Sequence, residues 1–316
     1  MIPILEEAAL RAAVSPKRAV DVTREAFRAD GEGRTRVPPV INLDIPARNG
    51  EFHIKTAHIE GVPHIAVKIA SGFYDNPARG LPSGSGLMAL FDAATGMPCA
   101  LLLDNGFLTD VRTAAAGAVA AEALARTSID TVGVVGSGVQ ARWQVRCLAV
   151  VRNVHRVVAW SPNRARLEAY CAEMRQEGYD AEAAASVKEV CGVADVLVTA
   201  TPSRSPFVHA QWLREGMHVT ALGSDSSGKQ ELAAECLDRA DLVVVDRLTQ
   251  CSAFGELRHA IEAALLTRHD VHAELGAIVA GRKEGRTSDA QITIADLTGV
   301  GFQDTAIASA AFRWLS

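Results

Sequence analysis

The alternation of apolar and polar residues divides the chain into two regions of different texture. In the first region, residues 16–30 repeat apolar side chains at helical spacing and predict a helix. Residues 37–69 then read as strands, in the runs VINLDI, EFHIKTAHI and HIAVKIA. Residues 71–86 predict a loop, and LMALFDA and PCALLLD predict two strands joined by a turn at residues 94–97. A long alanine-rich helix is expected over residues 108–127.

From about Thr131 onward, short apolar strands alternate with helices. The strand TVGVV runs into a glycine turn, the helix VQARWQVRCLAVV follows, and the strand RVVAWS comes next. The alternation continues through NRARLEAYCAEMRQEG, DAEAA, SVKEVCGVA, DVLVTATP and DLVVVD. This order is typical of a doubly wound parallel sheet with right-handed crossovers. Residues 291–315 predict a last strand, a glycine turn and an apolar helix that we expect to pack on the N-terminal domain.

The predicted fold class is therefore α/β with two domains. Residues 121–299 form a Rossmann dinucleotide-binding domain. Residues 1–120, completed by the C-terminal residues 300–316, form an α+β domain.

Composition narrows the range of functions. Hydrophobic residues make up 48% of the chain and aromatic residues 5%, so the core must be mostly aliphatic. The net charge of -5 and the scattered Lys and Arg residues argue against nucleic acid or an anionic membrane as a partner. No apolar run approaches the ~18 residues of a membrane span. The N-terminus lacks the pattern of a signal peptide. Six cysteines without CxxC or zinc spacing indicate free thiols in a cytoplasmic protein with no metal site.

The glycine turn carries the clearest functional signal. Gly136-Ser137-Gly138-Val139-Gln140-Ala141 is a GxGxxA motif that directly follows a strand and opens a helix. Gly136 permits the tight turn, and Gly138 lets the backbone approach a pyrophosphate at the helix N-terminus. We expect these glycines, with Val139 and Gln140, to bind NAD or NADP. The competing interpretation is an ordinary turn in an α/β protein.

The end of the next strand bears on the choice of cofactor. NAD sites usually carry Asp or Glu there, to bind the ribose 2′-hydroxyl. This chain instead continues as Trp160-Ser161-Pro162-Asn163-Arg164. Ser161, Asn163 and Arg164 are suited to a 2′-phosphate, which favours NADP slightly. The alternative is that Arg164 is an ordinary arginine of the helix surface, or that Arg166 takes its place.

Two cations in the N-terminal region need an explanation. Lys68 interrupts the apolar run HIAVKIA, so it lies either at a sheet edge or in a site. Arg112 begins a helix, where its charge opposes the helix dipole. A substrate carboxylate would balance Arg112, and so would Asp104 or Asp110.

At these residues the chain resembles the ornithine cyclodeaminase/μ-crystallin family. Three blocks carry the resemblance in the family's order and cover nearly the whole chain. They are Lys68 with DAATGMP and LTDVRTAA, the turn GSGVQA, and GSDSSGKQEL.

The resemblance implies a homodimer in which the N-terminal domain provides the dimer contact and half of the substrate site. It also implies hydride transfer between NAD(P) and an imine or amino acid. Carried over to this chain, Lys68 and Arg112 bind the substrate carboxylate, and Asp225 is the catalytic acid/base. Lys68 is expected to assist catalysis, and Arg112 to contact the cofactor as well. Ser83 is implied in substrate binding, and Thr201, Gly299 and Val300 in cofactor binding.

The residue types agree with this chemistry. Arg binds a carboxylate through two parallel hydrogen bonds, and an imine accepts hydride well only when it is protonated. Composition alone would favour Asp225 as a capping residue of the turn GSDSSG.

One departure from the family pattern points to a substrate. Where cyclodeaminases for ornithine carry an acid, thirteen residues before the matched lysine, this chain has Lys55. A lysine suits a second carboxylate or no extra charge. SGFYDNPARGLPSGSGLM also resembles the branch associated with hydroxyaspartate and ectoine breakdown. We therefore predict reduction of a small α-imino acid, with the conversion of iminosuccinate to aspartate as the specific candidate. The alternatives are a cyclodeaminase with recycled NAD, an alanine dehydrogenase-like enzyme, and a μ-crystallin-like protein that binds NADPH and a ligand without turnover.

Overall fold

The computed structural model describes residues 2–226 and 228–315, which belong to two compact units. Unit 1 comprises Met1–Arg112 and Val300–Ser316, and unit 2 comprises Thr113–Gly299. The division falls inside helix α3 (Phe107–Leu124), whereas the sequence placed it at residue 120, near the end of the same helix.

Unit 1 is built on a seven-stranded sheet of order β1-β7-β6-β5-β4-β2, with β3 also paired to β4. Strand β1 runs parallel to β7, and the other pairs are antiparallel. The strands are β1 (Ile4–Glu6), β2 (Thr35–Arg36), β3 (Ile41–Ile45), β4 (Gly50–Ile59), β5 (His64–Phe73), β6 (Gly84–Asp92) and β7 (Pro98–Leu103). The 3-10 helices η1 (Pro46–Arg48) and η2 (Asn76–Arg79) lie in the loops.

The loop predicted over residues 71–86 is wrong at both ends. Ser71 pairs with Ser85 and Gly72 with Gly84, so β5 and β6 each extend into the predicted loop. The ladder to the neighbouring strand overrides the weak strand propensity of Gly and Ser. The sequence also gave no sign of β1 or of helix α1 (Glu7–Ala13).

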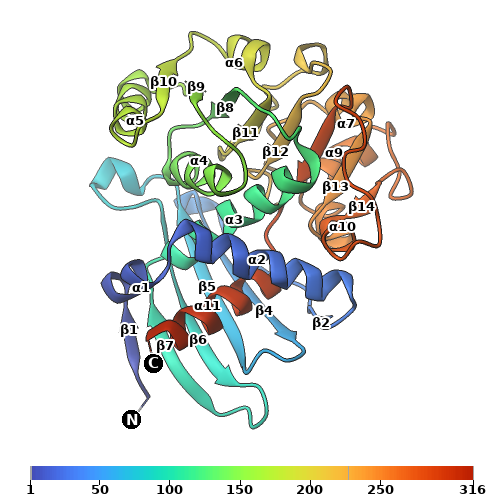
Figure 1. Cartoon of the computed structure of the whole chain (residues 1–316). Coiled ribbons are helices and arrows are strands. Elements are labelled where there is room, and N and C mark those ends of the chain that lie inside the picture. The colour runs from blue at the N-terminus through green and yellow to red at the C-terminus, as the bar shows by residue number, and fades with distance from the viewer. Residues whose placement is uncertain (1, 227, 316) are drawn as a thin grey trace. The chain divides into compact units, whose positions relative to one another are not determined.

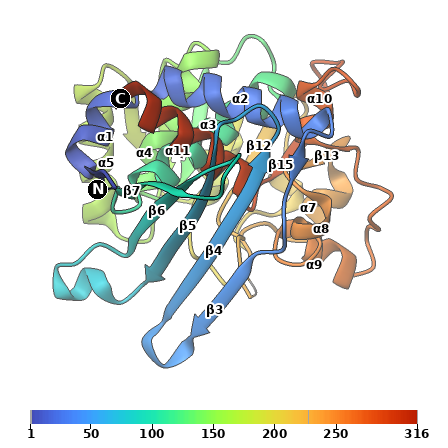
Figure 2. The same cartoon turned by 90° about the horizontal axis from the view of Figure 1, so that it is seen from below.

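Helices α2 (Pro16–Gly31) and α11 (Gly301–Leu315) lie on the same face of this sheet (Figures 1 and 2). Ser15 caps α2 by accepting a hydrogen bond from the Arg18 amide, with Pro16 in the first turn. The rings of Phe27 and Phe302 pack edge to face at 5.2 Å. A Cβ on Gly301 would lie 2.3 Å from the Thr56 carbonyl oxygen, so only glycine lets α11 approach β4 this closely. The predicted packing of the C-terminal helix on the N-terminal domain is confirmed.

Unit 2 contains an eight-stranded parallel sheet of order β10-β9-β8-β11-β12-β15-β13-β14, flanked by helices (Figure 1). The order reverses between β8 and β11, and ligands of doubly wound sheets bind at such a reversal. The predicted Rossmann topology is confirmed. The strands are β8 (Thr131–Val135), β9 (Arg156–Trp160), β10 (Asp180–Ala183), β11 (Val196–Thr199), β12 (His218–Ala221), β13 (Leu242–Val245), β14 (Ala273–Glu274) and β15 (Thr293–Asp296).

The helices of unit 2 flank a sheet whose central strands are buried along their length. All five residues of β8 are buried, which explains its unbroken apolar sequence. The elements are α4 (Val139–Val151), α5 (Arg164–Gln176), α6 (Val187–Val193), η3 (Ala210–Trp212), α7 (Glu235–Arg239), α8 (Leu248–Cys251), α9 (Glu256–Glu262) and α10 (Leu275–Val279).

Three further findings concern the described residues. No helix in residues 2–226 or 228–315 has the length and apolar character needed to cross a membrane. The six cysteines are free, and five of them are buried. No group of three or more His, Cys, Asp or Glu side chains in the described ranges has the arrangement of a metal site.

Candidate active site

The glycine turn connects β8 to α4. The Gly136 amide donates to the Trp160 carbonyl oxygen at 2.8 Å, which ties the turn to β9. Gly136 has a φ of +125°, and a Cβ there would lie 2.9 Å from the Ala200 carbonyl oxygen. Both observations require glycine at this position.

Gly138 is needed for a different reason. It is the N-cap of α4, no side chain caps the helix, and a Cβ on Gly138 would meet no protein atom within 4 Å. Val139, the first helical residue, is 48% exposed. The space over Gly138 and the first-turn amides therefore suit a phosphate, which the positive end of the helix dipole attracts. These residues fit the pyrophosphate of a dinucleotide.

Arg142 braces this turn from within α4. Its Nη1 donates to the Ser137 and Gly138 carbonyl oxygens at 2.7 and 3.0 Å, and its Nε pairs with Glu173 at 2.6 Å. The Ser137 and Ser161 hydroxyls are 2.9 Å apart. Arg142 was not predicted as a site residue, because its place as the fourth residue of α4 gives no sign that its side chain turns back to the glycines.

The end of β9 carries no acid, as the sequence indicated. Asn163 caps α5, with its Oδ1 accepting from the Arg166 amide at 3.0 Å. Arg164 forms an ion pair with Glu168 one turn along, and its side chain is 64% exposed. This ion pair within α5 supports the interpretation of Arg164 as an ordinary surface residue. Its exposed guanidinium can still approach a ligand.

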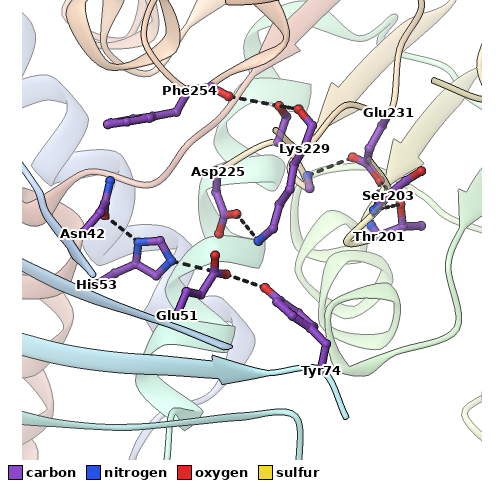
Figure 3. Close-up of polar contacts among 12 residues, drawn as sticks. Asn42, Glu51, His53, Tyr74, Thr201, Ser203, Asp225, Lys229, Glu231 and Phe254 are labelled. Carbon is purple, nitrogen blue, oxygen red and sulfur yellow. Dashed lines mark hydrogen bonds and ion pairs between the residues drawn. The ribbon is translucent and has the colours of Figure 1, made fainter. Parts of the chain in front are cut away.

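A buried carboxylate organises the ends of β11 and β12. Glu231 is fully buried and accepts from the Thr199 hydroxyl, the Thr201 amide and hydroxyl, and the Gly223 amide, at 2.7 to 2.8 Å. Burial raises the pKa of Glu231, and these hydrogen bonds oppose the rise. Glu231 thus holds Thr201 in place (Figure 3). It belongs to the block GSDSSGKQEL, but the sequence did not indicate its role.

Asp225 follows β12 and pairs with a lysine of the same loop. Lys229 Nζ lies 2.7 Å from Asp225 Oδ1 (Figure 3). The Lys229 side chain is almost fully buried, whereas that of Asp225 is 39% exposed. Asp225 is therefore oriented by an anchored ammonium and still has surface to offer a reactant. In the sequence, Lys229 stands out only as part of the block GSDSSGKQEL.

Gly299 and Val300 lie where the chain passes from unit 2 to unit 1. Gly299, with a φ of +77°, donates its amide to Asp246 Oδ2 at 2.6 Å and accepts from Gln250 Nε2 at 2.8 Å. Val300 is fully buried and its carbonyl accepts from the Gln303 amide.

Unit 1 gathers three buried cations. Lys55 of β4 is directly opposite Lys68 of β5, and their side chains share the face of the sheet that α11 covers. Arg112 is 3% exposed. Its Nε lies 2.8 Å from Asp304 Oδ1, and Lys68 Nζ lies 3.4 Å from Asp304 Oδ2. Gln303 accepts from Arg112 Nη1 at 2.9 Å.

The electrostatics of this cluster follow from its burial. Burial lowers the pKa of Lys68 to about 7, Arg112 and Lys55 lower it too, and Asp304 opposes the fall. Burial acts to raise the pKa of Asp304, but Arg112 and Lys68 outweigh it, and the net pKa is lowered. Two of the three cations therefore share one resident carboxylate.

The partner of Arg112 is not one of the two acids that the sequence suggested. Asp304, from the C-terminal helix, balances it. Asp104 instead caps α3 by accepting from the Leu108 amide at 2.8 Å, and burial raises its pKa to about 6. Lys68 is not at a sheet edge either, because β5 lies between β4 and β6.

The outer end of the same sheet carries a second polar network (Figure 3). His53 Nδ1 lies 2.7 Å from Asn42 Oδ1, and its Nε2 lies 3.3 Å from Glu51 Oε1. The Tyr74 hydroxyl donates to Glu51 Oε1 at 2.5 Å. This network links β3, β4 and the end of β5, and sequence reasoning did not anticipate it. Ser83 is exposed just before β6, and its carbonyl oxygen accepts from the Phe73 amide at 2.7 Å.

Comparison with known proteins identifies relatives over nearly the whole chain. The family model described as "Ornithine cyclodeaminase/mu-crystallin family" matches residues 4–313. An "uncharacterized cyclodeaminase" of Sinorhizobium fredii is 46% identical over 297 residues, which cover 93% of this chain and 90% of that protein. The iminosuccinate reductase of Paracoccus denitrificans is 32% identical over 307 residues, 97% of this chain and 94% of that protein.

Three solved structures share the fold. An archaeal alanine dehydrogenase dimer with bound NAD has a TM-score of 0.92 and 34% identity, covering 99% of this chain and 95% of that one. The Thermococcus litoralis Δ1-pyrroline-2-carboxylate reductase with NADH and L-proline has a TM-score of 0.95 and 29% identity, covering 99% and 97%. The Paracoccus denitrificans iminosuccinate reductase with NAD+ has a TM-score of 0.89 and 31% identity, covering 99% and 96%.

Proposed function

This chain belongs to the ornithine cyclodeaminase/mu-crystallin family of NAD(P)-dependent enzymes, and we propose that it reduces a small α-imino acid to the L-amino acid. The substrate we favour is iminosuccinate, and the product is aspartate. In the reaction, one protonated imine and one NAD(P)H give the amine and NAD(P)+. The product amine then takes up one further proton.

The observation that carries the choice of substrate is the pairing of Lys55 with Lys68. Side chains directly opposite each other on antiparallel strands have Cβ atoms about 4.5–5.5 Å apart, and like charges there repel. Both lysines are at least 94% buried, so solvent screens them little. A ligand with two carboxylates relieves this repulsion, whereas the second ammonium of ornithine would increase it.

Lys68 and Arg112 are the proposed ligands of the α-carboxylate, and Lys55 of the second carboxylate. A buried ammonium and a guanidinium form short, charge-assisted hydrogen bonds with carboxylate oxygens. Ser83 remains a proposed substrate contact.

Asp225 is the proposed acid/base. A nicotinamide bound at the glycine turn would supply a hydride to the imine carbon. The electron pair of the C=N bond then becomes the lone pair of the amine, which takes a proton from Asp225 or from water that it orients. Lys229 orients Asp225 through their 2.7 Å contact, and Lys68 is proposed to assist by fixing the carboxylate next to the reacting carbon.

We assign the cofactor to the glycine turn, with Gly136, Gly138, Val139 and Gln140 at the pyrophosphate. Ser161, Asn163 and Arg164 are its proposed ribose contacts, and Thr201, Gly299, Val300 and Arg112 are further proposed contacts. The missing acid after β9 favours NADPH, whereas the solved relatives cited above hold NAD, NADH or NAD+. The relative affinity of the two cofactors tests this preference directly.

We also propose a homodimer formed through unit 1. Ile41 and Leu43 of β3 are 62% and 58% exposed on the sheet face opposite α2 and α11, next to Ile54 and Phe52. The archaeal alanine dehydrogenase is described as a dimer. The free cysteines support a cytoplasmic location. Light scattering on the purified protein should give the mass of two chains.

The test is a substrate comparison with a matched pair of variants. NAD(P)H oxidation is followed with oxaloacetate plus ammonia and with pyruvate plus ammonia. Lys55→Met should raise KM for the four-carbon substrate about 10- to 100-fold, because a buried charge-assisted hydrogen bond is lost. It should change KM for the three-carbon substrate little. Lys17→Met, which removes a lysine 74% exposed in the same unit, should change neither.

A cyclodeaminase is the second candidate, supported by the name of the Sinorhizobium fredii relative. Such an enzyme releases ammonia from ornithine and recycles its NAD, so no net change in nicotinamide absorbance occurs. Conversion of ornithine to proline without any imine reduction would replace the reductase proposal. Binding of NADPH with neither activity would favour a binding protein.

A further inference from the structure

Asp304 is a buried acid among the substrate-binding cations, and the proposed reaction gives it no task. It lies in the first turn of α11 and is 0% exposed. It forms ion pairs with Arg112 and Lys68 at 2.8 and 3.4 Å. A carboxylate in this position occupies the same cations that a substrate carboxylate would need.

The contacts of Asp304 are electrostatic rather than well-formed hydrogen bonds. Neither of its carboxylate oxygens, nor Arg112 Nε, has a hydrogen-bond partner of good geometry in the structure. The 3.4 Å contact to Lys68 is also longer than the roughly 2.7–2.9 Å of a charge-assisted hydrogen bond. Buried ion pairs without full hydrogen bonding do not repay their desolvation completely. One carboxylate offsets only one of the two positive charges, so the pair of cations keeps a net positive charge and N–H groups to offer a better acceptor.

The backbone that carries Asp304 is fixed, whereas the cations have long side chains. The neighbouring Thr305 hydroxyl donates to the Ala57 carbonyl oxygen at 2.8 Å and accepts from the Ala66 amide at 3.2 Å. This residue therefore ties α11 to both β4 and β5. The Gly301 contact with β4 ties the same turn of the helix. Asp304 must stay in place when a ligand enters.

We propose that Asp304 is a positioning residue, a fixed counter-ion that keeps Lys68 charged and aligned with Arg112 and so extends substrate carboxylate binding to neutral pH. This inference rests on the proposed function, because it concerns the same carboxylate-binding cations. At a pH where Lys68 and Arg112 are both charged even without Asp304, Asp304 instead competes with the ligand for these two cations.

The charged groups around Lys68 define how binding depends on pH. Lys55 on β4 and Arg112 on α3 disfavour its ammonium form, and Asp304 on α11 favours it. Asp104, before α3, is the further acid whose pKa responds to Asp304. Because burial brings the pKa of Lys68 to about 7, anion binding should weaken as the pH rises above that value. Removing an opposite charge at this range lowers a lysine pKa by about 1–3 units.

Succinate is the probe for the experiment, since it carries two carboxylates and needs no turnover. Its Kd is measured by calorimetry from pH 5 to pH 9 for the wild type, Asp304→Asn and Asp304→Glu. The wild-type Kd should rise about tenfold per pH unit above about 7. Asp304→Asn should begin this rise at least one unit lower. It should bind succinate as tightly as the wild type or tighter at pH 5, and at least about tenfold more weakly at pH 8.

Plots of Kd against pH that cross between the wild type and Asp304→Asn distinguish this role from simple damage to the fold. A purely structural role for Asp304 predicts weaker binding at every pH, and that result overturns the inference. Asp304→Glu keeps the charge, so the break, which is the pH at which Kd begins to rise, should stay near that of the wild type. A shifted break in this variant also overturns the inference. Asp44→Asn, which removes an exposed acid of β3 in the same unit, should leave the break in place.

The outcomes also separate this inference from the proposed function. If succinate binding by Asp304→Asn weakens at a lower pH than binding by the wild type, and the wild type reduces no imine, the role of Asp304 is supported and the reductase is refuted. If the wild type reduces iminosuccinate, but its succinate binding and that of Asp304→Asn weaken at the same pH, the role of Asp304 alone is refuted.

Discussion

Asp296 should make the stability of this protein fall as the pH rises from about 4 to about 7. It ends β15 and is 1% exposed, with its Oδ2 accepting from the Leu257 amide at 2.9 Å. Burial raises its pKa to about 7, the hydrogen bond from Leu257 opposes the rise, and Asp246 adds to it. The folded state therefore binds a proton that the unfolded chain has already released.

The sign and size of the effect follow from proton linkage. Below the unfolded pKa of about 4, both states are protonated and the stability is fully present. Between the two pKa values only the folded state keeps the proton, so stability is lost until the pH exceeds about 7. Three pH units at about 1.4 kcal/mol each set an upper limit of about 4 kcal/mol for this one carboxyl.

Substitution isolates the contribution of Asp296 from that of other groups. Asp296→Asn keeps an oxygen that can accept from Leu257 but cannot ionise. Urea unfolding, followed by circular dichroism at pH 5, 6, 7 and 8, gives the free energy of unfolding for each protein. The variant should gain on the wild type by up to about 3 kcal/mol between pH 5 and pH 8, because about two of the three pH units fall within this range. Asp289→Asn, at an exposed position, should show no such gain.

The reasoning fails if Asp296→Asn and the wild type keep a constant difference in stability across this range. Such a result would mean that Asp296 stays ionised in the folded state. The most direct cause would be water or a cation reaching the carboxylate.

Further predictions concern four residues of unit 2. Gly138→Val should weaken NADPH and NADH binding at least about tenfold by fluorescence titration, because the new side chain enters the space for phosphate. Its melting temperature should stay within about 3 °C of the wild type, whereas Gly136→Ala should lower it, since its Cβ would lie 2.9 Å from a carbonyl oxygen. Arg164→Ala should weaken NADPH about tenfold and leave NADH unchanged; equal effects on both would remove the 2′-phosphate role. Glu231→Gln should lower the free energy of unfolding by about 2–4 kcal/mol, measured by urea unfolding, because the new amide NH2 group faces donors that then lack an acceptor. An unchanged free energy of unfolding would show that water accepts from those donors.

The sequence by itself determined the features that depend on neighbouring residues. The GxGxxA turn between β8 and α4, the alternation of strands and helices from β8 to β11, and the last helix were predicted correctly. Each rests on the spacing of apolar residues or on a glycine that a local turn requires. The alternation in EFHIKTAHI likewise placed Lys55 in a strand.

The same local reasoning failed where pairing between strands outweighed propensity. Ser71–Phe73 and Gly84–Gly86 read as loop, but the ladder between β5 and β6 makes them strand. The face of the sheet on which Lys55 and Lys68 lie was equally undetermined, because alternation gives the period of a strand but not the side on which a helix will pack.

Only the tertiary structure decided what surrounds the candidate site residues. Gln303 contacts Arg112 across 191 positions of sequence, and Asp304 comes from the same turn of helix. Glu231 accepts from Thr199 at the end of β11, 32 residues earlier in the sequence, and from Gly223 after β12, eight residues earlier. No periodicity records such partners, because a buried charge is stabilised by whichever group the fold brings within a few ångströms. The sequence could therefore indicate that Arg112 needed a counter-charge, and the folding of α11 against β4 and β5 determined that Asp304 supplies it.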